Sequence, residues 1–214
     1  MGISRLQIIT QDINGKSHTQ LAEEACKAGA EWIQLRLKNK SEEEYKKTAS
    51  EVKEICRLYN ALLIINDNVS VAKEIAADGV HVGKNDMPSS EARRILGNKF
   101  IIGGTANTWE DILMHNEFVN YVGVGPFRFT DTKENLSPVL GINGFYRLME
   151  QCRKNSISIP VIAIGGITAE DVSPIIETGV HGVAVASAVN KVENKQEIIK
   201  SILIQLQPSG ICNH

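Results

Sequence analysis

Eight short apolar runs, each followed by a longer amphipathic stretch, predict an α/β fold in which parallel strands close into a single (β/α)8 TIM barrel. No composition shift, Pro/Ser-rich linker or low-complexity block divides the chain, so residues 1–214 are expected to form one barrel domain. The dinucleotide fingerprint GxGxxG is missing after the first run, and GVGPFR (123–128) carries Arg128 at its third glycine. A doubly wound open sheet is therefore the second choice.

The expected strands are short runs rich in Val, Ile and Leu. In chain order they are LQIIT (6–10), WIQLR (32–36), LLIIN (62–66), GVHVG (79–83), FIIGG (100–104), YVGVG (121–125), PVIAIGG (160–166) and HGVAVAS (181–187). The helices after them are expected to begin near Ser17, Ser41, Val69, Ser89, Thr108, Ile142, Thr168 and Glu193. Several of these positions suit a helix N-cap, and SEEE at 41–44 is typical of a capping box.

Charge and cysteine content restrict the partners. A net charge of -2 offers no electrostatic case for binding nucleic acid or an anionic membrane, so anion recognition is expected to be local. The four cysteines are scattered without a CxxC pair, which predicts reduced structural thiols and a cytoplasmic location. MGISRLQIIT lacks the apolar core of a secretion signal, and no apolar run reaches the length of a membrane span.

The stretch EWIQLRLKNK (31–40) places polar side chains at every second position of a hydrophobic run. Gln34, Arg36 and Lys38 therefore share one face of an extended strand. An edge strand with a solvated face would explain them equally well in isolation. A closed barrel has no edges, so we expect this face to point inward, near the barrel mouth.

Chemistry in a (β/α)8 barrel takes place at the carboxyl ends of the strands, where several polar residues of this sequence fall. They are Asn66, Asp67, Asp86, Thr105, Thr130, Thr132 and Lys133. The two aspartates are hard oxygen ligands that suit Mg²⁺, and the cations Arg36, Lys38 and Lys133 suit the phosphate charge of a substrate. Taken singly, each aspartate is also explained as a helix cap or a turn residue.

A second anion site is expected where the seventh and eighth strands end, in GGI (165–167) and ASA (186–188). Small residues there let backbone N–H groups approach a phosphate closely, although tight packing alone would also require glycine. Among the histidines, His81 and His181 are expected in hydrogen-bonded interior or mouth positions. His18, His115 and His214 are expected at the surface.

Six segments together resemble the thiamine phosphate synthase family, also called thiamine-phosphate pyrophosphorylase. They are QLRLK (34–38), IND (65–67), DGVHVGKND (78–86), YVGVGPFRFTDTK (121–133), PVIAIGGI (160–167) and GVAVASA (182–188). The resemblance implies a transferase on a (β/α)8 barrel that uses Mg²⁺. It would join 4-amino-2-methyl-5-(diphosphooxymethyl)pyrimidine to a (carboxy)thiazole phosphate, giving thiamine phosphate and pyrophosphate by a dissociative substitution.

The resemblance also implies roles for individual residues. The pyrimidine diphosphate would contact Gln34, Arg36, Lys38, Asn66, Thr105 and Lys133. The thiazole phosphate would contact Thr130, Thr132, Gly166, Ala186 and Ser187, and Mg²⁺ would bind Asp67 and Asp86. Arg36, Lys38, Lys133 and Thr105 would act in catalysis. The sequence departs from the family pattern at Thr105, usually Ser, at Asn107, often His, and at Lys84, often Gln.

Three other functions fit parts of the pattern. A thiazole tautomerase of the same barrel family would share the thiazole phosphate pocket but would not need the metal and diphosphate residues. A non-catalytic sensor of thiamine phosphate would gain little from the carboxylates, and a phosphosugar isomerase would need a general base at the mouth. Homo-oligomerisation, a preference for carboxylated thiazole and closure of the loop at 126–141 are left open.

Overall fold

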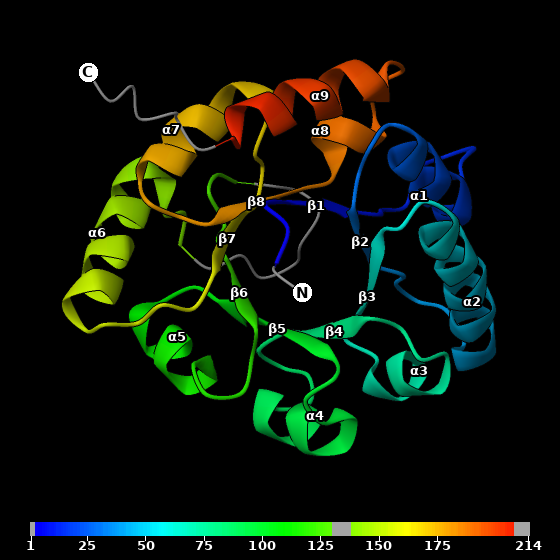
Figure 1. The fold of residues 1–214 in the computed structure, drawn as a ribbon, viewed down its shortest axis with the longest axis horizontal. Coiled ribbons are helices and arrows are strands. Elements are labelled where there is room, and N and C mark those ends of the chain that lie inside the picture. The colour runs from blue at the N-terminus through cyan, green and yellow to red at the C-terminus, as the bar shows by residue number, and fades with distance from the viewer. Residues whose placement is uncertain (1–2, 130–137, 208–214) are drawn as a thin grey trace.

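The computed structural model describes residues 3–129 and 138–207, which form a closed barrel of eight parallel strands surrounded by helices (Figure 1). The strands pair in chain order, β1 to β8, and β8 closes the ring by pairing with β1. Their bounds are β1 Leu6–Ile9, β2 Trp32–Leu35, β3 Leu62–Asn66, β4 Gly79–Val82, β5 Ile101–Ala106, β6 Tyr121–Val124, β7 Val161–Ile164 and β8 Gly182–Val185. The predicted barrel is confirmed, and the alternative of an open sheet is wrong.

The helices lie outside the ring and follow the strands almost where the sequence predicts. They are α1 His18–Lys27, α2 Glu42–Leu58, α3 Val69–Glu74, α4 Ser89–Leu96, α5 Trp109–His115, α6 Gly141–Lys154, η1 Ala169–Asp171, α7 Val172–Glu177, α8 Ser187–Asn190 and α9 Lys195–Gln205. Both Ser17 and Ser41 form capping boxes, in which the N-cap hydroxyl and a side chain three residues on satisfy each other's backbone amides. The short α8 directly after β8 is an element that the sequence did not indicate.

Alternation along each strand divides the apolar residues between two cores. On β2, Ile33 and Leu35 belong to the large core between strands and helices, whereas Trp32 belongs to a small cluster with Tyr121 of β6. Because successive side chains of a strand point to opposite faces, this small cluster lies inside the barrel. Gln34 shares the face of Trp32 and is 3% exposed, so it points inward as expected.

The surface position expected for His18 is wrong. Its side chain is buried, with Nδ1 2.8 Å from the Thr10 hydroxyl and Nε2 3.2 Å from the Asp12 carboxylate. His115 is half-buried, because its ring packs under β5. Both follow from tertiary packing of a helix against a strand end, which helical periodicity alone does not reveal. His214 lies outside the described residues. Within those residues, no helix has both the length and the apolar character needed to cross a membrane.

Candidate active site

The carboxyl ends of the strands bring the predicted polar residues to one rim of the barrel. Gln34 lies inside β2 near its end, Asn66 is the last residue of β3, and Thr105 is the penultimate residue of β5. Arg36 comes directly after β2, is half-buried and donates its backbone N–H to the Thr10 hydroxyl at 3.1 Å. Lys38 is exposed two residues further on. The residues Thr130, Thr132 and Lys133 lie outside the described part of the chain, so their roles stay predictions.

Two carboxylates from neighbouring strand ends meet at this rim. Asp67 follows β3 in a left-handed conformation, with φ of 64°, and its backbone N–H donates to the His81 carbonyl at 2.8 Å. Asp86, in the loop after β4, accepts the Gly83 N–H at 2.7 Å. Burial, a hydrogen bond to Asp86 and the charge of Asp86 raise the pKa of Asp67 to about 7, against the opposing effect of Arg36. The pair therefore favours a bound proton or cation between its oxygens.

The donor set of this pair suits Mg²⁺. A methyl group added at Gly83 would lie 2.6 Å from an Asp86 oxygen and 3.9 Å from an Asp67 oxygen, so the two carboxylates turn toward the same small space. Among the described residues, no group of three or more His, Cys, Asp or Glu side chains forms a metal cluster. Mg²⁺ commonly uses one or two carboxylates and completes its coordination with waters and substrate phosphates. Asp67 and Asp86 would hold such an ion.

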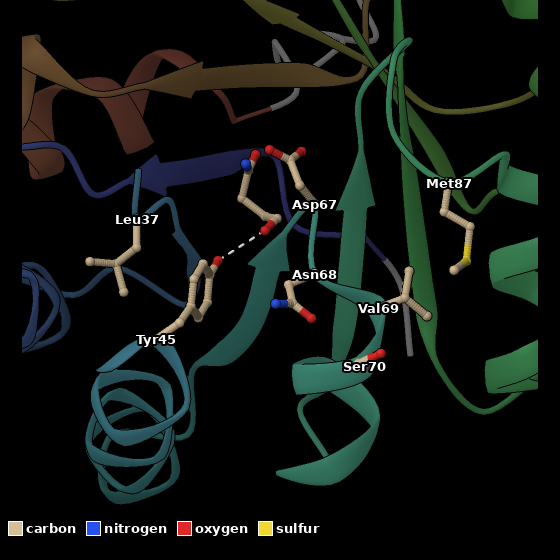
Figure 2. A pocket seen from close by; sticks show the side chains of 8 residues that line it. Leu37, Tyr45, Asp67, Asn68, Val69, Ser70 and Met87 are labelled. Atoms are coloured by element: carbon tan, nitrogen blue, oxygen red, sulfur yellow. Dashed lines mark hydrogen bonds between the residues drawn. The ribbon is translucent and has the colours of Figure 1, made fainter. Parts of the chain in front are cut away.

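Tyr45, near the start of α2, fixes the backbone next to Arg36 and Asp67. Its buried hydroxyl lies 3.1 Å from the Leu35 carbonyl and 2.9 Å from the Asn66 carbonyl, and Figure 2 shows it pointing at the end of β3. Tyr45 thus joins the ends of β2 and β3 directly before Arg36 and Asp67. Burial and the nearby Asp67 charge raise its pKa, so the phenol keeps its proton at neutral pH.

A pocket of about 380 Å³ opens beside Asp67, on the flank of the barrel mouth (Figure 2). It is lined by Leu37, Tyr45, Asn66, Asp67, Asn68, Val69, Ser70 and Met87. Tyr45 forms its wall toward α2, and the first turn of α3 forms the opposite wall. The space gives the Asp67 carboxylate access to solvent and to a ligand.

The turn after β7 has the backbone geometry expected of a phosphate site. Gly165 and Gly166 both adopt left-handed φ values, 103° and 70°, which favour glycine. The Arg128 side chain lies against Gly166, and its guanidinium pairs with Asp171 at 2.6 Å. Ile164 of β7 is in register with Ala184 of β8, so the glycine turn is next to the end of β8.

Ala186 and Ser187 follow β8 at that position. Ala186 is the N-cap residue of α8, and Ser187 begins the helix. The Ser187 hydroxyl donates to the Gln11 side-chain carbonyl at 3.1 Å, which connects the end of β8 to the loop after β1. The structure therefore brings Gly166, Ala186 and Ser187 to neighbouring strand ends, as the sequence predicts.

A family model described as thiamine monophosphate synthase matches residues 6–189. The chain belongs to this family. A thiamine-phosphate synthase of Bacteroides fragilis is 48% identical over 199 residues, which cover 92% of this chain and 98% of the relative. A thiamine-phosphate synthase of Flavobacterium johnsoniae is 46% identical over 200 residues, which cover 93% and 94%. The solved structure of a thiamine phosphate pyrophosphorylase from Pyrococcus furiosus matches with a TM-score of 0.82 at 32% identity, covering 94% of this chain and 95% of that one.

Membership of the thiamine monophosphate synthase family confirms the resemblance seen in the sequence. Lys84 and Asn107, two residues that depart from the family pattern, both form hydrogen bonds or ion pairs in the structure. Lys84 pairs with the Asp111 carboxylate at 2.5 Å, and the same carboxylate accepts the Asn107 backbone N–H at 2.7 Å. Although burial opposes it, these contacts lower the pKa of Asp111. The Asn107 side chain donates to the Gly125 carbonyl at the end of β6. Both residues thus connect neighbouring loops at the rim of this synthase-family barrel.

Sequence reasoning missed several residues of this thiamine monophosphate synthase site. Tyr45 lies on a helix whose periodicity only predicts packing, and nothing local shows that its hydroxyl reaches two strands. Gln7 did carry a signal, because a Gln inside the apolar run LQIIT shares the inward face with Ile9. Arg128 was noted only as an interruption of a glycine pattern, yet it covers the Gly166 turn.

Proposed function

We propose that the protein catalyses the Mg²⁺-dependent condensation of 4-amino-2-methyl-5-(diphosphooxymethyl)pyrimidine with a thiazole phosphate, giving thiamine phosphate and pyrophosphate. The observation that carries this proposal is the placement of two anion-adapted regions at one rim. The carboxylate pair with Arg36 lies at β2 to β4, and the glycine turn lies at β7 and β8, across the ring of eight strands. Two phosphorylated substrates would be held from opposite sides, with their reacting atoms over the barrel axis.

In this proposal the diphosphate binds at the carboxylate side. Arg36 is half-buried, and a planar guanidinium forms paired hydrogen bonds with phosphate oxygens. A bound Mg²⁺ would neutralise charge on the leaving diphosphate. Arg36, Lys38 and Lys133 would stabilise the same charge as the bond from the methylene carbon to the diphosphate oxygen breaks. The thiazole nitrogen then donates its electron pair to that carbon, so no protein nucleophile is needed.

The thiazole phosphate would bind at the other side of the rim. The left-handed glycines would present their backbone N–H groups to the phosphate, and Ser187 lies at the neighbouring strand end. Thr130 and Thr132 are proposed to complete this site. Holding the phosphate would bring the thiazole nitrogen toward the methylene carbon, and such positioning contributes several kcal/mol in well-oriented reactions, roughly 7–11 at its upper range.

Pyrophosphate release tests the proposal directly. Purified protein is assayed with both substrates, with each alone, and with both substrates after chelation of Mg²⁺. Release that needs both substrates and Mg²⁺ supports the synthase. Isomerisation of a thiazole tautomer alone would support the tautomerase alternative, and tight binding of thiamine phosphate without release would support a sensor.

Matched variants sharpen this assay. Asp67→Asn and Asp86→Asn should each lower turnover at limiting Mg²⁺, whereas Glu54→Gln on the exposed face of α2 should leave it unchanged. Equal rates for all three variants at limiting Mg²⁺ would contradict the metal assignment.

The proposed location is the cytoplasm, supported by the free thiols of Cys26, Cys56 and Cys152, all buried.

A further inference from the structure

A hydrogen-bonded chain of polar side chains crosses the inside of the barrel below the mouth. In spatial order its members are Gln34, Gln7, Tyr121, His81 and Thr105, from β2, β1, β6, β4 and β5. The four links measure 3.3, 3.2, 3.1 and 3.0 Å in that order. The chain joins two residues predicted to contact the pyrimidine substrate, Gln34 and Thr105, through three residues to which no role has been assigned.

Close packing fixes Tyr121, the central member of this series of hydrogen bonds. Tyr121 is fully buried, and its ring packs edge-on against Trp32 with centroids 4.8 Å apart, which fixes the position of the hydroxyl. A methyl group at Gly103 would lie 2.4 Å from the Tyr121 oxygen and 2.5 Å from His81 Nδ1. Glycine at this position therefore leaves the space in which the tyrosine and the histidine meet.

The contacts give the chain one direction. The Gln34 amide nitrogen donates to the Gln7 carbonyl, and the Gln7 amide nitrogen donates to the Tyr121 oxygen. Burial raises the pKa of Tyr121, so the phenol keeps its proton. A buried hydroxyl hydrogen needs an acceptor, and we assign that role to His81 Nδ1, which lies 3.1 Å from the Tyr121 oxygen.

The direction continues to the rim. With Nδ1 accepting, the neutral imidazole carries its hydrogen on Nε2 and donates to the Thr105 oxygen. The Thr105 hydroxyl hydrogen is then directed to another acceptor. At the opposite end, Gln34 contacts Gln7 through its amide nitrogen, and its side-chain carbonyl is the group that would accept from a ligand.

We propose that Tyr121 is a positioning residue of the site, whose hydroxyl sets the orientation of the Gln34 amide and the Thr105 hydroxyl. The substrate class that this polarity matches is a heteroaromatic ring that offers an N–H donor toward β2 and an acceptor atom toward β5. An aminopyrimidine carries both. The inference rests on the proposed function and deepens it, because it names side chains that would select the pyrimidine ring without touching it.

Tyr121→Phe removes the hydroxyl and keeps the ring against Trp32. We expect the KM for the pyrimidine diphosphate to rise about tenfold, because the buried hydrogen bonds of the Tyr121 hydroxyl are lost. The value of kcat should change less than about threefold. The KM for the thiazole phosphate should stay within about twofold. Ile162→Val, in the same interior cluster, is the matched control, because it weakens packing without touching the polar chain. It should change neither KM.

Nitrogen-15 NMR of histidine-labelled wild-type protein gives a readout independent of activity and of the variant's folding. The His81 signal, assigned by its loss in His81→Gln, should show a neutral ring with the hydrogen on Nε2 at pH 8. A hydrogen on Nδ1 would reverse the direction of the chain and overturn the proposal. So would an unchanged KM of Tyr121→Phe for the pyrimidine diphosphate, whether or not its Tm is lowered. Wild-type protein without pyrophosphate release would instead overturn the proposed function, while the NMR result would still test the chain.

Discussion

The carboxylate pair makes the stability of the metal-free protein depend on pH in an unusual direction. An aspartate ordinarily has a pKa near 3.8, whereas burial and contact with Asp86 raise the pKa of Asp67 to about 7. The folded state therefore binds the proton more tightly than the unfolded state. The resulting stabilisation is fully present below about pH 4 and is lost progressively as pH rises to about 7.

The size of this effect follows from the shift. A shift of about three units corresponds to about 4 kcal/mol if nothing screens it. Neighbouring protein atoms crowd the Asp67 carboxylate, but the residue still reaches solvent at the rim, so solvent screening reduces the expected contribution to about 1–2 kcal/mol. For a chain of this length, that changes Tm by about 2–8 °C.

Thermal denaturation in EDTA at pH 5.5 and pH 8 measures the effect. Asp67→Asn removes the titrating group, so at pH 8 the variant should be more stable than wild type without metal. Adding Mg²⁺ at pH 8 should stabilise wild type and have little effect on the variant. A metal-free variant that is less stable than wild type at pH 8, or one that keeps the full Mg²⁺ stabilisation, would refute the reasoning.

Three further substitutions test other parts of the site. Arg36→Ala should lower kcat/KM by a factor that corresponds to a loss of about 2–4 kcal/mol of transition-state stabilisation. A decrease of less than about threefold in steady-state kinetics would contradict its role. Tyr45→Phe should cost about 1–2 kcal/mol in urea unfolding, because two buried carbonyls lose their shared partner, and should weaken Mg²⁺ binding measured by calorimetry. Gly166→Ala forces a side chain into a φ of 70° beside Arg128, so the KM for the thiazole phosphate should rise while that for the pyrimidine diphosphate changes little.

The fold was predictable because the barrel depends on repeated local signals. Each strand is a short apolar run and each helix has a periodic apolar face, and eight such units in series leave few ways to pair parallel strands. Polar residues that end a strand could also be placed, since parallel strands end at one rim. Asp67 and Asp86 are therefore found together in the structure, although they lie 19 positions apart in the sequence.

The sequence by itself determined the class of fold, the family and the rim at which chemistry would take place. Only the tertiary structure decided that the Tyr45 hydroxyl joins two strands, that His18 is buried, and that Gln7 and Tyr121 connect Gln34 to His81. These contacts depend on which side chains meet across a closed ring, and the identity of a partner on another strand leaves no trace in local periodicity. Hydrogen-bond direction depends on the same long-range contacts, so the chemistry presented at the mouth is a property of the assembled barrel.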